Sequence, residues 1–87
     1  MKKCMITFRS VTPAQRAEGV LKRSGISCAL RRTPRWMEEQ GCGYSLALEF
    51  READRAVELL RQGQIPFRKI YLRQESGTFE ELERFDA

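Results

Sequence analysis

Residues 12–31 read TPAQRAEGVLKRSGISCALR and predict a helix that runs directly into a strand. At the start of the helix, Thr12 is a capping residue, Pro13 suits the first turn, and Gln15 completes a capping box. The small and apolar residues that recur at helical spacing, and therefore share one face, are Ala14, Ala17, Val20, Leu21 and Ser24. This pattern is typical of a helix that buries one side and exposes the other.

Gly25 marks the end of this helix. A glycine here predicts a left-handed residue that stops the helix, with Ile26 as its hydrophobic partner. The residues that then alternate with their neighbours, as in a strand, are Ile26, Cys28 and Leu30. Pro34 ends the strand, because it has no amide hydrogen to donate to a neighbouring strand.

The same periodicities predict the rest of the fold. The remaining elements are strands at 4–8, 44–50 and 67–72, a helix at 51–62 that Gly63 stops, and a short acidic helix at 78–87. This order predicts an α+β protein, a ferredoxin-like βαββαβ sandwich in which four antiparallel strands carry both helices on one face. The first and third strands are then central, and the loop between the second and third strands lies at one end of the sheet.

Length and composition set the broad class. Eighty-seven residues predict one domain spanning 1–87, with an acidic C-terminal tail from about 74 to 87. A hydrophobic content of 41% and a charged content of 32% are ordinary for a globular protein. The N-terminal apolar run is too short for a signal peptide and no run approaches a membrane span, so we expect a cytoplasmic protein.

Several kinds of chemistry are excluded by the residue types. The chain has no histidine, which removes Ser/His and Cys/His catalytic pairs and imidazole ligands for zinc. The three cysteines Cys4, Cys28 and Cys42 have no CxxC spacing and cannot all pair with one another. We therefore expect no disulfide framework, no metal site and no cofactor.

Charge is distributed unevenly along the chain. Residues 1–35 carry nine Lys or Arg and one acid, a net charge of +8, whereas residues 36–87 carry seven and eleven, a net charge of −4. The basic half is able to attract nucleic acid, an acidic partner or an anionic small molecule. The alternative is a solvated surface rich in arginine that binds nothing.

The three cysteines are not equivalent. Cys4 and Cys28 share the apolar phase of their strands and are predicted to be small core residues. Cys42 lies between Gly41 and Gly43, where the absence of Cβ atoms lets backbone amides approach the sulfur. Amide donors and a nearby cation such as Arg35 favour the thiolate. The alternative is a tight turn that holds an incidental thiol.

These features resemble the small bacterial family described as putative selenium/sulfur carrier proteins, a domain of unknown function. The resemblance runs from about Ile6 to about Leu72. It rests on the segment 6–8 leading into a helix, on Pro34-Arg35 after the second strand, and on Cys42-Gly43 before the third. It implies that Cys42 accepts sulfur or selenium as a persulfide or selenopersulfide, with Pro34 and Arg35 shaping its pocket.

The resemblance also implies partners. A cysteine desulfurase or a selenium-donating protein would load Cys42, and a downstream acceptor protein would take the atom, so the chain is a carrier rather than a true enzyme. Exchange at sulfur needs no histidine or metal. The single tryptophan, Trp36, lies in the same loop. It either covers the cysteine or anchors a partner, as tryptophan does at binding hot spots, or it packs across the end of the sheet.

Two rival functions share this fold. An RNA-recognition module stacks bases on aromatic residues of its two central strands. Here Cys42, Leu46 and Glu49 replace the basic and aromatic residues of that pattern, which argues against nucleic acid. The other rival is a regulatory or dimerisation module whose open sheet face pairs with a second copy. The small residues of that face are Met5, Thr7, Ser45 and Ala47.

Overall fold

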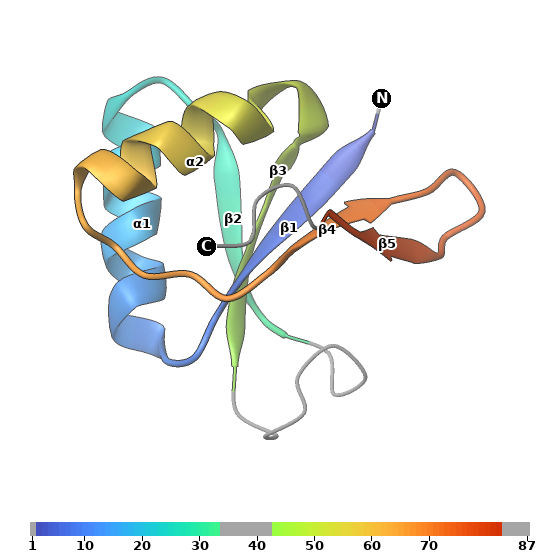
Figure 1. Ribbon diagram of the computed structural model, residues 1–87, viewed down its shortest axis with the longest axis horizontal. Coiled ribbons are helices and arrows are strands. Elements are labelled where there is room, and N and C mark those ends of the chain that lie inside the picture. The colour runs from blue at the N-terminus through green and yellow to red at the C-terminus, as the bar shows by residue number, and fades with distance from the viewer. Residues whose placement is uncertain (1, 34–42, 83–87) are drawn as a thin grey trace.

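The computed structural model describes residues 2–33 and 43–82. Two helices form one layer, which packs on a sheet of five strands (Figure 1). The elements are β1 (Lys3–Phe8), α1 (Val11–Arg23), β2 (Cys28–Arg32), β3 (Tyr44–Glu49), the 3-10 turn η1 (Phe50–Glu52), α2 (Ala53–Gln62), β4 (Ile70–Arg73) and β5 (Phe79–Glu81).

The strands lie in the order β2-β3-β1-β4-β5, and every neighbouring pair is antiparallel. Therefore β1 is parallel to β2 with β3 between them, and β3 is parallel to β4 with β1 between them. Each helix links two parallel strands that are one strand apart, as in a split βαβ unit. The predicted βαββαβ order and the central positions of the first and third strands are confirmed.

The prediction of four strands is wrong, because the sheet has five. The helix predicted at 78–87 is also wrong for residues 78–82, the part of it that the structure describes. Phe79–Glu81 is a fifth strand, β5, which pairs with β4. Gly77, at φ 90°, closes the turn between them, and the amide of Gln74 donates to the carbonyl of Thr78 at 2.7 Å. A short isolated helix is marginal, whereas a strand here completes its hydrogen bonds on the edge of β4.

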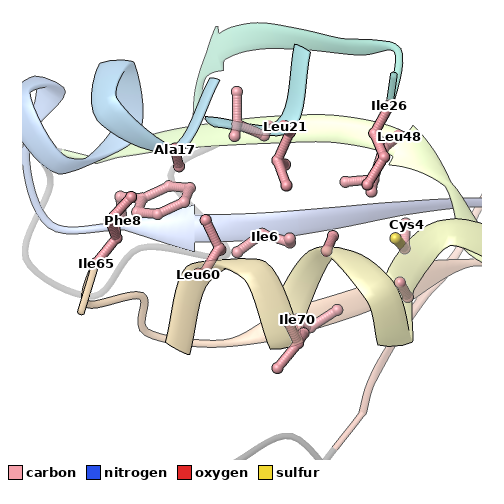
Figure 2. Packing of buried hydrophobic residues seen from close by; sticks show 14 of the residues in the cluster. Cys4, Ile6, Phe8, Ala17, Leu21, Ile26, Leu48, Leu60, Ile65 and Ile70 are labelled. Carbon is pink, nitrogen blue, oxygen red and sulfur yellow. The ribbon is translucent and has the colours of Figure 1, made fainter. Parts of the chain in front are cut away.

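The core lies between the sheet and the helices. Along β1, Cys4, Ile6 and Phe8 are fully buried, whereas Met5 between them is half-buried on the opposite face. Figure 2 shows Leu21 of α1 and Leu60 of α2 pointing into the layer that Ile6 occupies. The other buried residues that the helices supply are Ala14, Ala17, Ala53, Ala56 and Val57. Both helices therefore cover one face, and we call the other face the open face.

The start of α1 differs from the prediction, and its end agrees with it. The helix begins at Val11 with Ser10 as the N-cap, and no side chain makes a capping hydrogen bond, so the predicted capping box is wrong. At the other end Gly25 has a φ of 84°. The amide of Ile26 donates to the carbonyl of Leu21 at 2.9 Å, the long-range bond of a Schellman motif.

The second helix ends at Gln62 as predicted, but Gly63 is not the left-handed residue. Gln64 takes that conformation, with a φ of 54°. The amide of Ile65 then donates to the carbonyl of Leu60 at 2.9 Å, which completes the same motif at the end of α2. Ile65 is buried in the core, and such an apolar contact often accompanies this motif.

Element boundaries differ by a few residues elsewhere. β2 begins at Cys28 instead of 26, and a 3-10 turn precedes α2. β4 begins at Ile70 instead of 67, although the amide of Arg68 donates to the carbonyl of Thr7 at 2.8 Å and continues the pairing with β1. The extended segment predicted at 67–72 is therefore present, but its regular part, β4, begins later than predicted.

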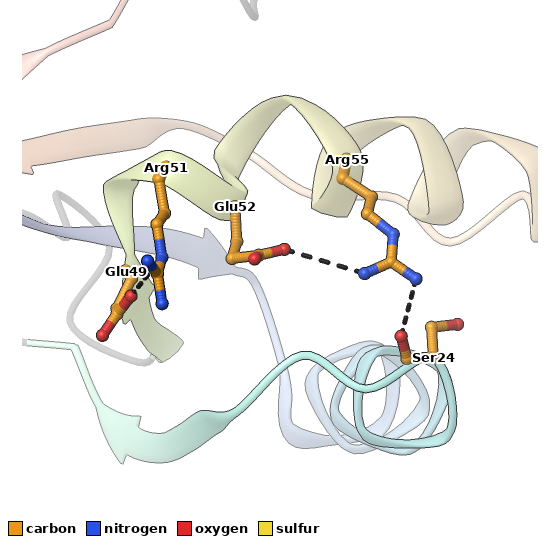
Figure 3. A network of polar contacts seen from close by, with 5 residues as sticks. All are labelled: Ser24, Glu49, Arg51, Glu52 and Arg55. Atoms are coloured by element: carbon orange, nitrogen blue, oxygen red, sulfur yellow. Dashed lines mark hydrogen bonds and ion pairs between the residues drawn. The ribbon is translucent and has the colours of Figure 1, made fainter.

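A polar network fastens the start of α2 to the end of α1 (Figure 3). Arg55 donates to the carbonyl of Ser24 at 2.7 Å and lies 3.8 Å from the carboxylate of Glu52. Next to it, Arg51 pairs with Glu49 at 2.6 Å. These pairs are largely exposed, so each contributes only a few tenths of a kcal/mol up to about 1 kcal/mol.

Candidate functional site

The loop between β2 and β3 carries almost all of the predicted site. Of the predicted site residues, Gly43 is described, and Pro34, Arg35, Trp36, Gly41 and Cys42 lie outside the described residues. Gly43 is buried, and its carbonyl accepts a hydrogen bond of 3.0 Å from the amide of Thr33. This bond extends the ladder of β2 and β3 by one step beyond the pair Arg32 and Tyr44. The pairing of β2 with β3 therefore continues to Thr33 and Gly43, the described residues on either side of the loop.

Two buried hydroxyl groups lie at this base of the loop. The Oγ1 atom of Thr33 and the Oγ atom of Ser45 have no hydrogen-bond partner within the described part of the chain. Ser45 is fully buried, and Thr33 is 9% exposed. A buried hydroxyl without a partner costs about 1–3 kcal/mol, so such atoms in a native protein need a reason. Both can donate a proton to an anion, which is the capacity that a thiolate or persulfide site uses.

Cations also gather beside the loop base. Arg31 and Arg32 end β2, and the guanidinium of Arg32 lies 5.6 Å from the centre of the Tyr44 ring. A cation over an aromatic face is held there by the ring quadrupole. Sequence reasoning named Arg35 and missed these two arginines, although the basic pair immediately before the loop is visible in the sequence.

Cys4 is a structural thiol, as predicted. Its side chain is fully buried in the core, and burial raises its pKa from the ordinary value of 9.0 to about 12. Because the thiolate is the reactive form, this cysteine is inert at neutral pH.

Cys28 is less buried than predicted, because β2 is an edge strand and leaves one side of the residue half-exposed. Burial nevertheless raises its pKa, the nearby Glu18 carboxylate raises it further, and Lys22 opposes the shift. Desolvation and a like charge both disfavour the thiolate. Neither of the two described cysteines is therefore activated for nucleophilic chemistry.

Residues 2–33 and 43–82 also bear on metal binding and on membrane insertion. In these two ranges no three Cys, Asp or Glu side chains come together as ligands for a metal ion. The helices formed by the described residues are also too short and too polar to cross a membrane. The loop base with its arginines and hydroxyls is thus the part of the described structure that bears on the predicted chemistry.

The comparison with protein families identifies the family of the chain. A family model described as Putative Se/S carrier protein-like matches residues 3–72, which is most of the chain. The chain belongs to this family. The match begins with β1 and ends in β4, so it includes the whole loop between β2 and β3 and leaves β5 outside. The chain matches no curated protein and no solved structure.

Proposed function

We propose that the protein carries a sulfur or selenium atom on Cys42. Family membership supports a carrier role. The raised pKa values of the other two cysteines support the choice of Cys42 as the carrier residue. Cys4 is buried with a pKa of about 12, and the pKa of Cys28 is raised by burial and by Glu18. The observation that carries the proposal is that the pKa of both described thiols is raised, which disfavours the nucleophilic thiolate at each of them and supports the choice of Cys42.

The transfer step is a thiol–persulfide exchange. The Cys42 thiolate attacks the terminal sulfur of a donor persulfide, a Cys42–sulfur bond forms, and the donor S–S bond breaks. The electron pair of the broken bond leaves on the donor thiolate, and the proton of the persulfide stays on the transferred sulfur. No oxidant is consumed, because the transferred sulfur keeps its oxidation state. A selenium atom would follow the same course.

The surroundings of the loop base favour an anion on Cys42. Arg31 and Arg32 immediately precede the loop, and cations near a thiol lower its pKa. Thr33 and Ser45 add hydroxyl donors without other partners in the described structure. Pro34, Arg35, Trp36, Gly41 and Gly43 are proposed to complete the pocket around the sulfur.

A carrier of this kind works between proteins. The donor is proposed to be a cysteine desulfurase or a selenium-donating protein, and the acceptor is a second protein that takes the atom from Cys42. Loading from the donor and unloading to the acceptor are both thiol–persulfide exchanges, so the protein needs no catalytic acid or base of its own.

The proposal is tested by intact-mass analysis after incubation with a cysteine desulfurase and cysteine. The wild-type protein should gain the mass of one sulfur atom, which dithiothreitol removes. Cys42→Ala should gain nothing, and the matched control Cys28→Ser should load as the wild type does. A sulfur adduct of equal size on Cys42→Ala would reject Cys42 as the carrier residue.

A further inference from the structure

A groove of about 440 Å³ crosses the open face of the sheet. All five strands contribute to its lining, from Ala29 in β2 to Phe79 in β5. Its floor is apolar at the centre, where Met5 of β1 lies directly opposite Ala47 of β3. The proposed transfer chemistry uses none of this surface apart from the two arginines at one end.

The groove is strongly cationic. Its charged lining residues are Lys3, Arg31, Arg32 and Arg73, and no carboxylate lines it. None of the four makes an ion pair with a carboxylate of the described chain. The acidic residues on the same face are already occupied. Glu49 pairs with Arg51 at 2.6 Å and Glu81 pairs with Lys69 at 3.3 Å.

The cations are spread along the groove, and this spread favours an extended ligand. Arg31 lies on the outer strand β2, and Arg73 lies on β4, three strands away in the sheet. With neighbouring strands about 4.8 Å apart, these two strands are separated by roughly 14 Å, a distance that four to five extended peptide residues span. A single small anion reaches only one end of such a distribution.

The floor of the groove distinguishes a peptide from a nucleic acid. Single-stranded RNA on a sheet of this kind is held by bases stacked on aromatic rings of the two central strands. Here β1 and β3 line the groove with Lys3, Met5 and Ala47, none of which is aromatic. The aromatic residue in the lining, Phe79, comes from the edge strand β5. An apolar floor with a charged rim matches a peptide with acidic and apolar side chains.

We propose that this groove binds an acidic, extended segment of the protein that loads or unloads Cys42. The identity of that partner rests on the proposed carrier function, whereas the chemistry of the segment rests on the groove alone. Arg31 and Arg32 belong both to the groove and to the base of the loop, so a segment bound here lies next to the chain that carries Cys42.

The first test measures binding by fluorescence anisotropy. The probe is a short fluorescein-labelled peptide in which glutamate alternates with leucine, and the controls are the same peptide with glutamine for glutamate and a single-stranded oligoribonucleotide of similar length. The double variant Lys3→Gln with Arg73→Gln, which removes two groove cations away from the base of the loop, should weaken binding of the acidic peptide about tenfold at low salt. The matched variant Arg16→Gln with Arg23→Gln removes the same charge from exposed positions on α1 and should have less than half of that effect.

The second test separates docking from transfer. Sulfur loading is followed by mass with a cysteine desulfurase as donor and, in parallel, with inorganic polysulfide. The groove variant should raise the KM for the desulfurase several-fold and leave loading by polysulfide unchanged, because polysulfide needs no docking surface.

The outcomes of the two tests decide separately on the peptide site and on its link to Cys42. Equal binding of the acidic and glutamine peptides, or tighter binding of RNA than of the acidic peptide, would overturn the proposal. Equal loss of binding in the groove and α1 variants would overturn it as well. Groove-dependent binding of the acidic peptide without any sulfur adduct would support the peptide site and overturn its link to Cys42.

Discussion

The three thiols should be alkylated by iodoacetamide at sharply different rates at about pH 8. Burial raises the pKa of Cys4 to about 12 from an ordinary value of 9.0. A rise of three pKa units lowers the thiolate population about a thousandfold, to roughly one molecule in 10⁴ at this pH. The Cys4 side chain is also fully buried, so its alkylation requires the protein to unfold. Cys42, as the proposed carrier, should react in the first, fast phase.

The assay is peptide mapping by mass spectrometry after timed exposure to iodoacetamide, with urea used to expose all thiols at the end. Cys42→Ala should remove the fast phase, and Cys28→Ser should leave it unchanged. Cys4 should become modified only when the protein unfolds, and its rate should follow the unfolding transition. Modification of Cys4 in the folded protein at the rate found for Cys42 would refute the argument that burial silences this thiol.

Four further predictions concern stability, each measured by urea denaturation. Gln64→Gly should stabilise the protein by about 1 kcal/mol, because Gln64 has a φ of 54° and glycine takes that conformation without strain. Gly25→Ala should destabilise it by a similar amount, since the φ is 84° although the space for a methyl group is open. The unfolding free energy should fall above pH 9, because a pKa raised in the folded state favours folding only while the unfolded thiol stays protonated. By pH 10.5 the loss due to Cys4 is about 2 kcal/mol, and Cys4→Ala should lack it. Ser45→Ala should leave stability unchanged or raise it by about 1 kcal/mol, because it removes a buried hydroxyl that has no partner in the described structure. Destabilisation by more than 1 kcal/mol would show that this hydroxyl makes a hydrogen bond.

The periodic part of the fold was predictable from sequence. Alternation at Cys4, Ile6 and Phe8 identified the buried face of β1, and Gly25 identified the end of α1. These features depend on a period or on one residue type, which a sequence displays directly. β5 was missed because a strand this short is stabilised by pairing with β4, and the sequence of residues 79–81 alone also fits a helical turn.

The site was predictable only in part. The position of the loop at one end of the sheet followed from the element order, and the bond between Thr33 and Gly43 agrees with it. The groove was not predictable, because its cations come from distant parts of the sequence. Lys3 and Arg73 become direct neighbours through the pairing of β1 with β4, and Arg31 joins them across β3. Such a cluster depends on strand register, which composition does not reveal.

The central claim is that Cys42 alone carries the transferred atom. It is tested most directly with a chain that retains Cys42 as its only cysteine, through Cys4→Val and Cys28→Ser, incubated in a single turnover with ³⁵S-cysteine and a cysteine desulfurase. The account predicts that this chain takes up one labelled sulfur, releases it to dithiothreitol, and does neither when Cys42 is also replaced by alanine. Two results would contradict it. One is labelled sulfur on a chain that differs from the wild type only by Cys42→Ala, and the other is no label on the chain that retains only Cys42.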